Sequence, residues 1–205
     1  MRKLIIALAL FSVIACKNKE VDQESEPGLM ESVQTVNKLN KAADAMKEYE
    51  KQTEKLKAIK PVSNDLFKQI LIENIDGFKR NSYNAGTASM VGLSSAEANY
   101  SNLNDKKVKI SIFDGAGESG SAFIAMTHMT IAMDMESIEG TKTKKIEVFE
   151  GVRTLTEEDS NLDNSTSASM TFIHNDRFQI ALEANKMSLA DLKEFMKKID
   201  LSALN

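Results

Sequence analysis

Soft metal ligands gather in one stretch of the sequence. Four methionines and a histidine lie close together there: Met126, His128, Met129, Met133 and Met135. Thioether sulfur and imidazole nitrogen suit Cu(I). On a helix, Met126, Met129 and Met133 share one face, with Phe123 one turn earlier. Because methionine also fills irregular cores, we interpret this face as the core face and His128 as solvent-facing, with copper binding as the alternative.

Three glycines within residues 115–120 spell G-x-G-x-x-G between an expected strand and an expected helix. The pattern is formally that of a dinucleotide-binding loop, in which glycines let the backbone approach a pyrophosphate. Asp134 and Glu136 follow the motif by about 20 residues, which is where a dinucleotide-binding loop has its ribose-binding acid. However, Asp114 and Glu118 would set two carboxylates beside the diphosphate, and the preceding strand is half polar. The sequence therefore favours a plain flexible turn.

Residues 159–164 copy the first half of an EF-hand calcium loop. The sixth position is Asn164 where the loop requires glycine, and the twelfth is Met170 where it requires a bidentate glutamate. A solvated hairpin loop is the better interpretation. Glu157 and Glu158 add negative charge, so weak calcium binding stays open.

Groups for nucleophilic catalysis are scarce. The chain has two histidines, one cysteine and no serine in a G-x-S-x-G elbow. His174 ends an expected strand beside Asn175 and Asp176, where the acid is either a catalytic partner or part of a turn. A non-catalytic protein without a cofactor is therefore favoured over an enzyme centred on His174.

The only cysteine, Cys16, closes an N-terminal segment laid out like a secretory signal. A basic head, Arg2 and Lys3, precedes an apolar run over residues 4–14, and small residues lead up to the cysteine. The run is too short for a bilayer-spanning helix, which needs about 20 residues. The segment resembles the lipobox signal of bacterial lipoproteins, with Val13 where such signals most often carry leucine.

The lipoprotein resemblance implies that residues 1–15 are a cleaved signal peptide and that Cys16 carries the lipid, a palmitate-type chain. Two or more acyl chains anchor a protein durably, whereas one does so only marginally. The protein is then expected in the cell envelope, held on the periplasmic face or at the outer membrane. Because no second cysteine exists, disulfides are excluded and the fold must rest on its packed core.

Residues 16–61 are expected to form a tether followed by a helix. Residues 17–28 are polar and have too little to bury to offset their ordering entropy, which predicts disorder. Over residues 29–60, apolar residues recur at helical spacing and form one narrow stripe: Leu29, Val33, Val36, Leu39, Ala43, Met46, Tyr49 and Leu56. We interpret this helix as a spacer, with self-association or a partner helix along residues 29–60 as the alternative.

Residues 62–205 are expected to form one α+β domain. Val108, Ile110 and Ile112 alternate with polar residues, as in a half-buried strand. Strands are expected at 94–103, 107–113, 144–149, 152–156, 168–173 and 178–184, and helices at 66–70, about 119–135 and from Ser188 onward. Alternating polar residues leave one sheet face in water, which predicts a mainly antiparallel twisted sheet of five to seven strands packed by two helices.

Composition and charge narrow the function classes. The chain is 42% hydrophobic and 27% charged, which is ordinary for a globular protein. Residues 61–205 carry 15 basic and 21 acidic residues. A nucleic-acid binder would concentrate basic residues on its folded part, so nucleic acid is excluded as a partner.

The end of the chain carries a second resemblance. Asn175-Asp176-Arg177-Phe178, with the residues at 187–204, is similar to the close of certain uncharacterised bacterial envelope proteins. This resemblance implies no activity. We therefore expect a lipid-anchored cell-envelope protein acting as a non-catalytic binding or accessory module. A copper-handling lipoprotein that uses the methionine helix is the alternative, followed by an envelope enzyme of unknown chemistry.

Overall fold

The computed structural model describes residues 47–86, 88–160 and 166–205. The expected signal peptide, the lipidation site Cys16, the tether and the first part of the long helix lie outside these residues. The description begins with a helical segment at 47–57. In the described ranges, no helix has both the length and the apolar content needed to span a bilayer.

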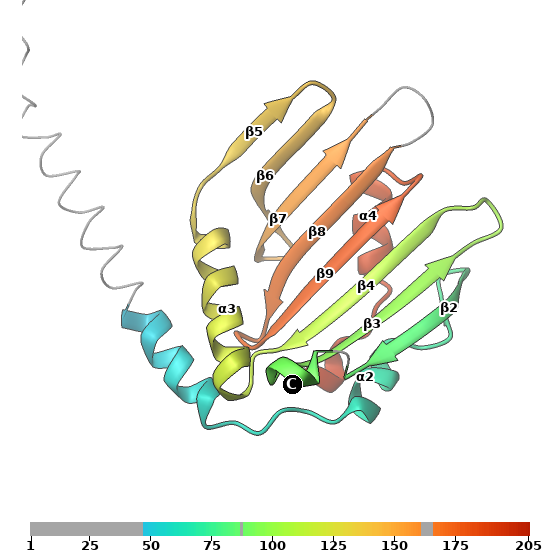
Figure 1. Cartoon of the computed structure of the whole chain (residues 1–205). Helices are drawn as coiled ribbons and strands as arrows, with labels where there is room; N and C mark the ends of the chain where they lie inside the picture. Colours follow the sequence, from blue (N-terminus) through green and yellow to red (C-terminus); the bar gives the residue numbers. More distant parts are fainter. Residues whose placement is uncertain (1–46, 87, 161–165) are drawn as a thin grey trace, which may run out of the picture. The chain divides into compact units, whose positions relative to one another are not determined.

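Within the described residues, nine antiparallel strands form one open sheet in the order β1-β2-β3-β4-β9-β8-β7-β6-β5 (Figure 1). The strands are β1 (Asn74–Ile75), β2 (Phe78–Ala85), β3 (Ser94–Ser101), β4 (Lys107–Asp114), β5 (Glu136–Glu139), β6 (Lys142–Phe149), β7 (Val152–Asp159), β8 (Ser167–His174) and β9 (Phe178–Asn185). Two meanders, β1–β4 and β5–β9, meet where β4 pairs with β9. The α+β class with an antiparallel sheet is confirmed.

The sheet holds nine strands rather than the expected five to seven. Two of the additional strands, β1 and β5, are short edge strands with little alternation. Residues up to Met135 were expected to be helical, but the helix ends at Ala132 and β5 begins at Glu136. β1 has only two residues, which is too short to show alternation. β5 is charged and has no buried residue, so its sequence carries no period-2 signal.

The two faces of the sheet are packed differently. α2 (Asn64–Ile70), α4 (Leu189–Met196) and the short η2 (Ser202–Leu204) lie on one side, which we call the covered face (Figure 1). α3 (Gly117–Ala132) lies on the opposite side, which we call the open face, and packs at one end of it. Three helices and a further helical segment therefore flank the described sheet, where two helices were expected.

The main core lies between the covered face and its helices. Val108, Ile110 and Ile112 of β4 all point into it, so the alternation seen in the sequence is confirmed. Phe195 of α4 packs its ring edge against Phe78, with ring centroids 5.0 Å apart. Ser188 caps α4 as expected, because its side chain accepts a hydrogen bond from the backbone N–H of Asp191.

A second, smaller core lies under α3. It contains Leu56, Ile124, Ile131 and Ile173, with Leu155 packed against it. Leu56 belongs to the apolar stripe predicted for the long helix, and it is almost fully buried. This end of the expected helix therefore packs on its own domain.

A buried ion pair fixes the start of α3. The carboxylate of Asp114, at the end of β4, has no solvent exposure and accepts two hydrogen bonds from Arg177, at 2.7 Å from Nε and 2.8 Å from Nη2. The backbone N–H of Ala116 donates to the same carboxylate at 3.0 Å, and that of Val62 donates at 2.8 Å. One side chain thus joins β4, the turn before β9, the segment before α2 and the residue directly before α3.

Replacing Arg177 with leucine should destabilise the protein strongly. The substitution leaves the Asp114 carboxylate buried without its cation, and breaking such a pair costs about 3–5 kcal/mol. Urea unfolding followed by circular dichroism measures the loss. Adding Asp114→Asn to the same chain should recover part of it, because the unpaired charge is then gone. A loss no larger than that of Lys106→Met, which breaks an exposed pair with Asp191, would contradict the prediction.

Candidate functional site

Polar side chains form a row across the open face. Lys109 of β4 lies between Asn99 of β3 and Glu183 of β9. The row continues through Ser169 of β8 to Glu157 of β7. A parallel row one pleat away contains Ser101, Lys107, Asn185, Ser167, Asp159 and Lys142. These residues are far apart in the sequence, and the strand register alone brings them together.

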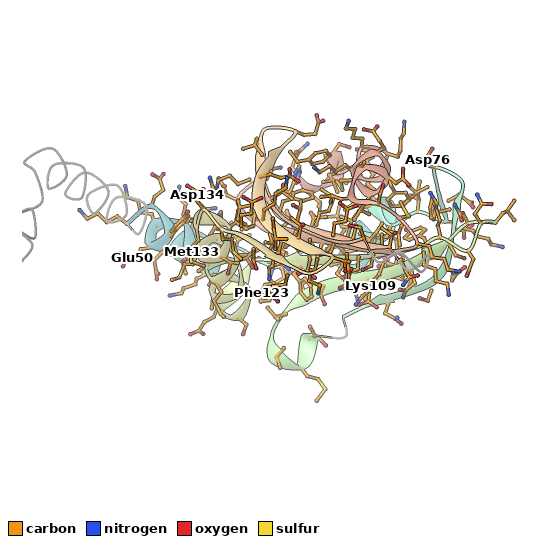
Figure 2. The ribbon with its side chains drawn as sticks, turned by 90° about the horizontal axis from the view of Figure 1, so that it is seen from above. Glu50, Asp76, Lys109, Phe123, Met133 and Asp134 are labelled. Carbon is orange, nitrogen blue, oxygen red and sulfur yellow. The ribbon has the colours of Figure 1, made fainter. Side chains whose placement is uncertain are left out.

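A hollow of about 530 Å³ lies over the two polar rows. Ser167 and Ser169 on β8 are short side chains and form its floor, and the longer Lys109, Glu183 and Glu157 stand around them. Figure 2 shows Lys109 on the side of the sheet that faces away from α4. The volume is within the range of small-molecule sites, about 300–1,000 Å³.

The charges around the hollow are paired but remain in contact with water. Lys109 Nζ lies 3.1 Å from Glu97 Oε2 and 3.7 Å from Glu183 Oε1. The hydrogen bond that Lys109 donates to Glu97 raises the pKa of Lys109, and Glu183 adds to this effect. On the far side, Lys142 Nζ lies 2.8 Å from Glu157 Oε1. The hollow therefore offers cations, carboxylates and hydroxyls together, which fits a hydrophilic ligand and not an acyl chain.

A second cavity, of about 350 Å³, lies where helical segment 47–57, α3 and the turns before β7 and β9 meet. Tyr49 and His128 both line it, and their rings contact each other, with centroids 5.0 Å apart and planes inclined by 30°. Gln52 Nε2 donates to the backbone carbonyl of Asp176 at 3.0 Å. Polar and aromatic groups thus hold the helical segment to the domain.

His128 was expected to face solvent, but it lines this second cavity. Its Nε2 atom is buried and has no hydrogen-bond partner among the described residues. Burial lowers the pKa of His128, and the nearby carboxylate of Asp176 opposes the shift in part. The imidazole is therefore held in its neutral form more strongly than an exposed histidine.

Arg153 closes the C-terminal end of α3, a role that the sequence did not indicate. Its Nε donates to the carbonyl of Ile131 at 3.0 Å, and its Nη2 lies 2.7 Å from Asp134 Oδ1. A guanidinium at this position satisfies a free helix carbonyl and complements the helix dipole. The contact joins β7 to a helix that precedes it by about 20 residues, so only the folded chain reveals it.

The prediction that the methionines form the core face of α3 is wrong. Met126, Met129 and Met133 are 70%, 54% and 56% exposed, whereas Ile124 and Ile131 are buried. The sheet meets the face of α3 that carries the isoleucines. The methionines therefore lie outward and His128 inward, so His128 does not converge on one point with Met126, Met129 and Met133.

The glycines of the G-x-G-x-x-G motif form a tightly packed junction rather than a flexible turn. A Cβ on Gly115 would clash with Ile124 and lie 2.6 Å from the carbonyl oxygen of Arg177. A Cβ on Gly120 would lie 2.7 Å from the carbonyl oxygen of Asp114. Gly117 has a φ of +81°, which favours glycine. The neighbours β3 and β9 both pair antiparallel with β4, unlike the parallel unit of a dinucleotide site.

His174 is separated from the other candidate groups. It ends β8, and its Nε2 is buried without a hydrogen-bond partner in the described part of the chain. Asn175 and Asp176 both have positive φ values and form the turn into β9, and the Asn175 side chain donates to the carbonyl of Leu204 at 3.2 Å. The neighbouring amide and acid therefore serve the turn, and no described contact joins them to His174 as a catalytic pair.

The calcium-like loop is only partly described, because residues 161–165 lie outside the described residues. Asp159 Oδ1 accepts a hydrogen bond from Thr141 at 2.6 Å, and Met170 is fully buried in the main core. The twelfth position thus points away from the loop. Among the described residues, no three His, Cys, Asp or Glu side chains gather to hold a metal ion.

Stability should fall as the pH drops from 7.5 to 5.5. Burial lowers the pKa of both His128 and His174 below the ordinary value of 6.5. In this pH range the unfolded chain therefore binds more protons than the folded chain, and the free energy of unfolding decreases as the pH falls. Urea unfolding at several pH values measures the slope. His174→Gln should flatten it in part, with His128 supplying the remainder. An unchanged slope in that variant would contradict the role of His174.

A scan against protein-family models and searches of curated proteins and of solved structures found no match to this chain.

Proposed function

We propose that this chain is a lipid-anchored cell-envelope protein whose open face binds a hydrophilic ligand or partner without catalysis. The observation that carries the binding role is the polar hollow over Ser167 and Ser169. The leader that resembles a lipobox supports the anchored location. Anchoring through Cys16 would hold the domain on the periplasmic face or at the outer membrane, with residues 29–60 as a spacer or a partner helix.

Binding is favoured over catalysis by how the titratable groups are distributed. The hollow is lined by lysines, acids, serines and asparagines and by neither histidine of the chain. The two histidines lie at separate places, one under α3 and one at the end of β8. A nucleophile, a base and an orienting group must lie within hydrogen-bond reach of one another. No described contact brings such a set together.

The lining of the hollow indicates the chemistry of its ligand. Lys109 and Lys107 stand on one side, Glu157 and Asp159 on the other, and Glu183 and Ser169 lie between them. Opposite charges at the two sides match a molecule that carries both an anionic and a cationic group, such as a short peptide. The lysines and carboxylates around the hollow are already paired with one another. A ligand must therefore replace these pairs with its own contacts, and it needs several hydrogen bonds to do so.

Cys16→Ser should abolish lipid labelling and release the protein from the membrane. The thiol is the only sulfhydryl in the chain, so no other cysteine can accept the acyl chain. Metabolic labelling with a palmitate analogue, followed by fractionation, compares the variant with the wild type. An unlabelled wild-type protein that still carries residues 1–15 would contradict the anchored location.

Ser169→Phe should block binding at the open face. The ring fills the floor of the hollow, and ligand affinity should fall at least tenfold, which corresponds to about 1.4 kcal/mol. A thermal-shift panel of zwitterionic dipeptides, neutral oligosaccharides, dicarboxylates and fatty acids supplies the ligands, and we expect the dipeptides to raise the melting temperature.

The matched control for this test is Ser137→Phe. Ser137 pairs with Lys144, which places it on the open face at the outer strand β5, outside the hollow. The control should keep the ligand response of the wild type. A panel in which no polar compound shifts the melting temperature, or in which Ser169→Phe responds like the wild type, would contradict a binding role for this face.

A further inference from the structure

We propose that Met126 and Met129, on the outward side of α3, and Met133, the C-cap residue directly after it, form a binding site for Cu(I) with three thioether ligands. The site is separate from the hollow of the open face, which none of these residues lines. We call these three residues the methionine triad. Three observations carry the proposal: the helical spacing of the sulfurs, their exposure, and the absence of competing charged groups on this part of α3.

The spacing lets three sulfurs reach one ion. Met126 and Met129 are three residues apart on α3, and Met133, its C-cap residue, is four residues beyond Met129. Each pair is therefore adjacent at the helix surface, with Cβ atoms about 5–6 Å apart. Met126 and Met133 are two turns apart, about 10.5 Å along the axis. A methionine side chain has three rotatable bonds and bends readily. The outer two can therefore lean toward Met129 and meet an ion above it.

The sulfurs are also free to bind. The triad is more than half exposed, and the packing that a helix of this composition needs is provided by Ile124 and Ile131 on the other side. Figure 2 shows Met133 and Asp134 at the end of the domain where the helical segment that carries Glu50 also lies. None of the three belongs to either core. Their exposure is therefore consistent with a use for the sulfur atoms themselves.

The surroundings select a soft monovalent cation. Between Ser119 and Met133 the sequence contains no Asp, Glu, Lys or Arg, and the carboxylate of the next residue, Asp134, is paired with Arg153. The hydroxyl of Thr130 donates back to the carbonyl of Met126 at 3.1 Å. Thioethers favour Cu(I), whereas carboxylates and carbonyls suit Mg²⁺, Ca²⁺ and Mn²⁺. His128 takes no part, because it faces the cavity with Tyr49.

Binding by thioethers has a distinctive dependence on pH. Cysteine, histidine and carboxylate ligands must lose a proton before they bind metal, so their affinity falls in acid. A thioether carries no such proton. The affinity of the triad for Cu(I) should therefore stay constant between pH 7.5 and 5.5, which separates it from any site that uses a histidine.

The test is a titration of the full-length chain with Cu(I), kept reduced by ascorbate without oxygen, in competition with a chromogenic Cu(I) chelator. Every sample carries Cys16→Ser, so that the thiol cannot bind the metal. We expect one Cu(I) per chain, at least tenfold weaker binding in each of Met126→Leu, Met129→Leu and Met133→Leu, and none in the triple variant. Leucine keeps the size and apolar character of the side chain and removes only the sulfur.

Met90→Leu is the matched control. Met90 lies in η1 (Ser89–Val91) and is 97% exposed, so it is a solvent-facing thioether outside α3. Its replacement should leave the affinity unchanged. Ag(I), a redox-stable probe of the same softness, should shift the ε-methyl NMR signals of the triad and not that of Met90.

The proposal is overturned if no complex forms, if the triple variant binds as the wild type does, or if Met90→Leu loses as much affinity as the triad variants. The last result would mean adventitious binding at any exposed methionine. An affinity that falls tenfold or more between pH 7.5 and 5.5 would likewise overturn it, because a protonating ligand would then be involved. None of these results bears on the hollow of the open face, so the two proposals fail separately.

Discussion

The structure depends most on the buried pair between Asp114 and Arg177. A carboxylate without solvent exposure loses its hydration, and only several charge-assisted hydrogen bonds can compensate. Asp114 receives four, two from Arg177 and one each from the backbone of Val62 and Ala116. The backbone N–H of Gly115 in turn donates to the carbonyl of Arg177 at 2.9 Å. The two meanders, the segment before α2 and the start of α3 are therefore held by one polar centre.

The sequence predicts those parts of the fold in which one face is clearly apolar. The alternation through Val108, Ile110 and Ile112 identifies both the strand β4 and its buried side, and Ser188 identifies the start of α4. It does not predict β5, since Glu136–Glu139 carries no such alternation. Charged edge strands are recognised only once a partner strand is known.

The orientation of α3 could not be read from its sequence, because the helix is apolar on more than one side. Its methionines and its isoleucines each recur at helical spacing, and a pattern with two apolar faces does not state which one is buried. Tertiary geometry decides. Gly115 and Gly120 bring the helix close to β4, and Ile124 then meets the sheet beside Gly115. Phe123 packs on Phe113 of the sheet, with ring centroids 4.9 Å apart.

The candidate sites differ in how far the sequence could reveal them. The methionine triad is local, so helical spacing alone identifies it, and the structure adds its exposure. The hollow of the open face exists because the strand register brings distant residues together. Lys109 and Ser169 both pair with Glu183 of β9, although 60 positions separate them in the chain. A single sequence holds no signal for such pairs of polar residues.

Both candidate sites depend on the placement of one helix. The inner side of α3 fills one end of the open face with Ile124 and Ile131, which leaves the polar end, over Ser167 and Ser169, open to water. The outer side of the same helix presents the methionine triad to solvent. Turning the helix by half a turn would bury the sulfurs and expose the isoleucines. Because Asp114 binds the backbone of Ala116 directly before α3, the ion pair that stabilises the fold also determines which of the two faces is offered to solvent.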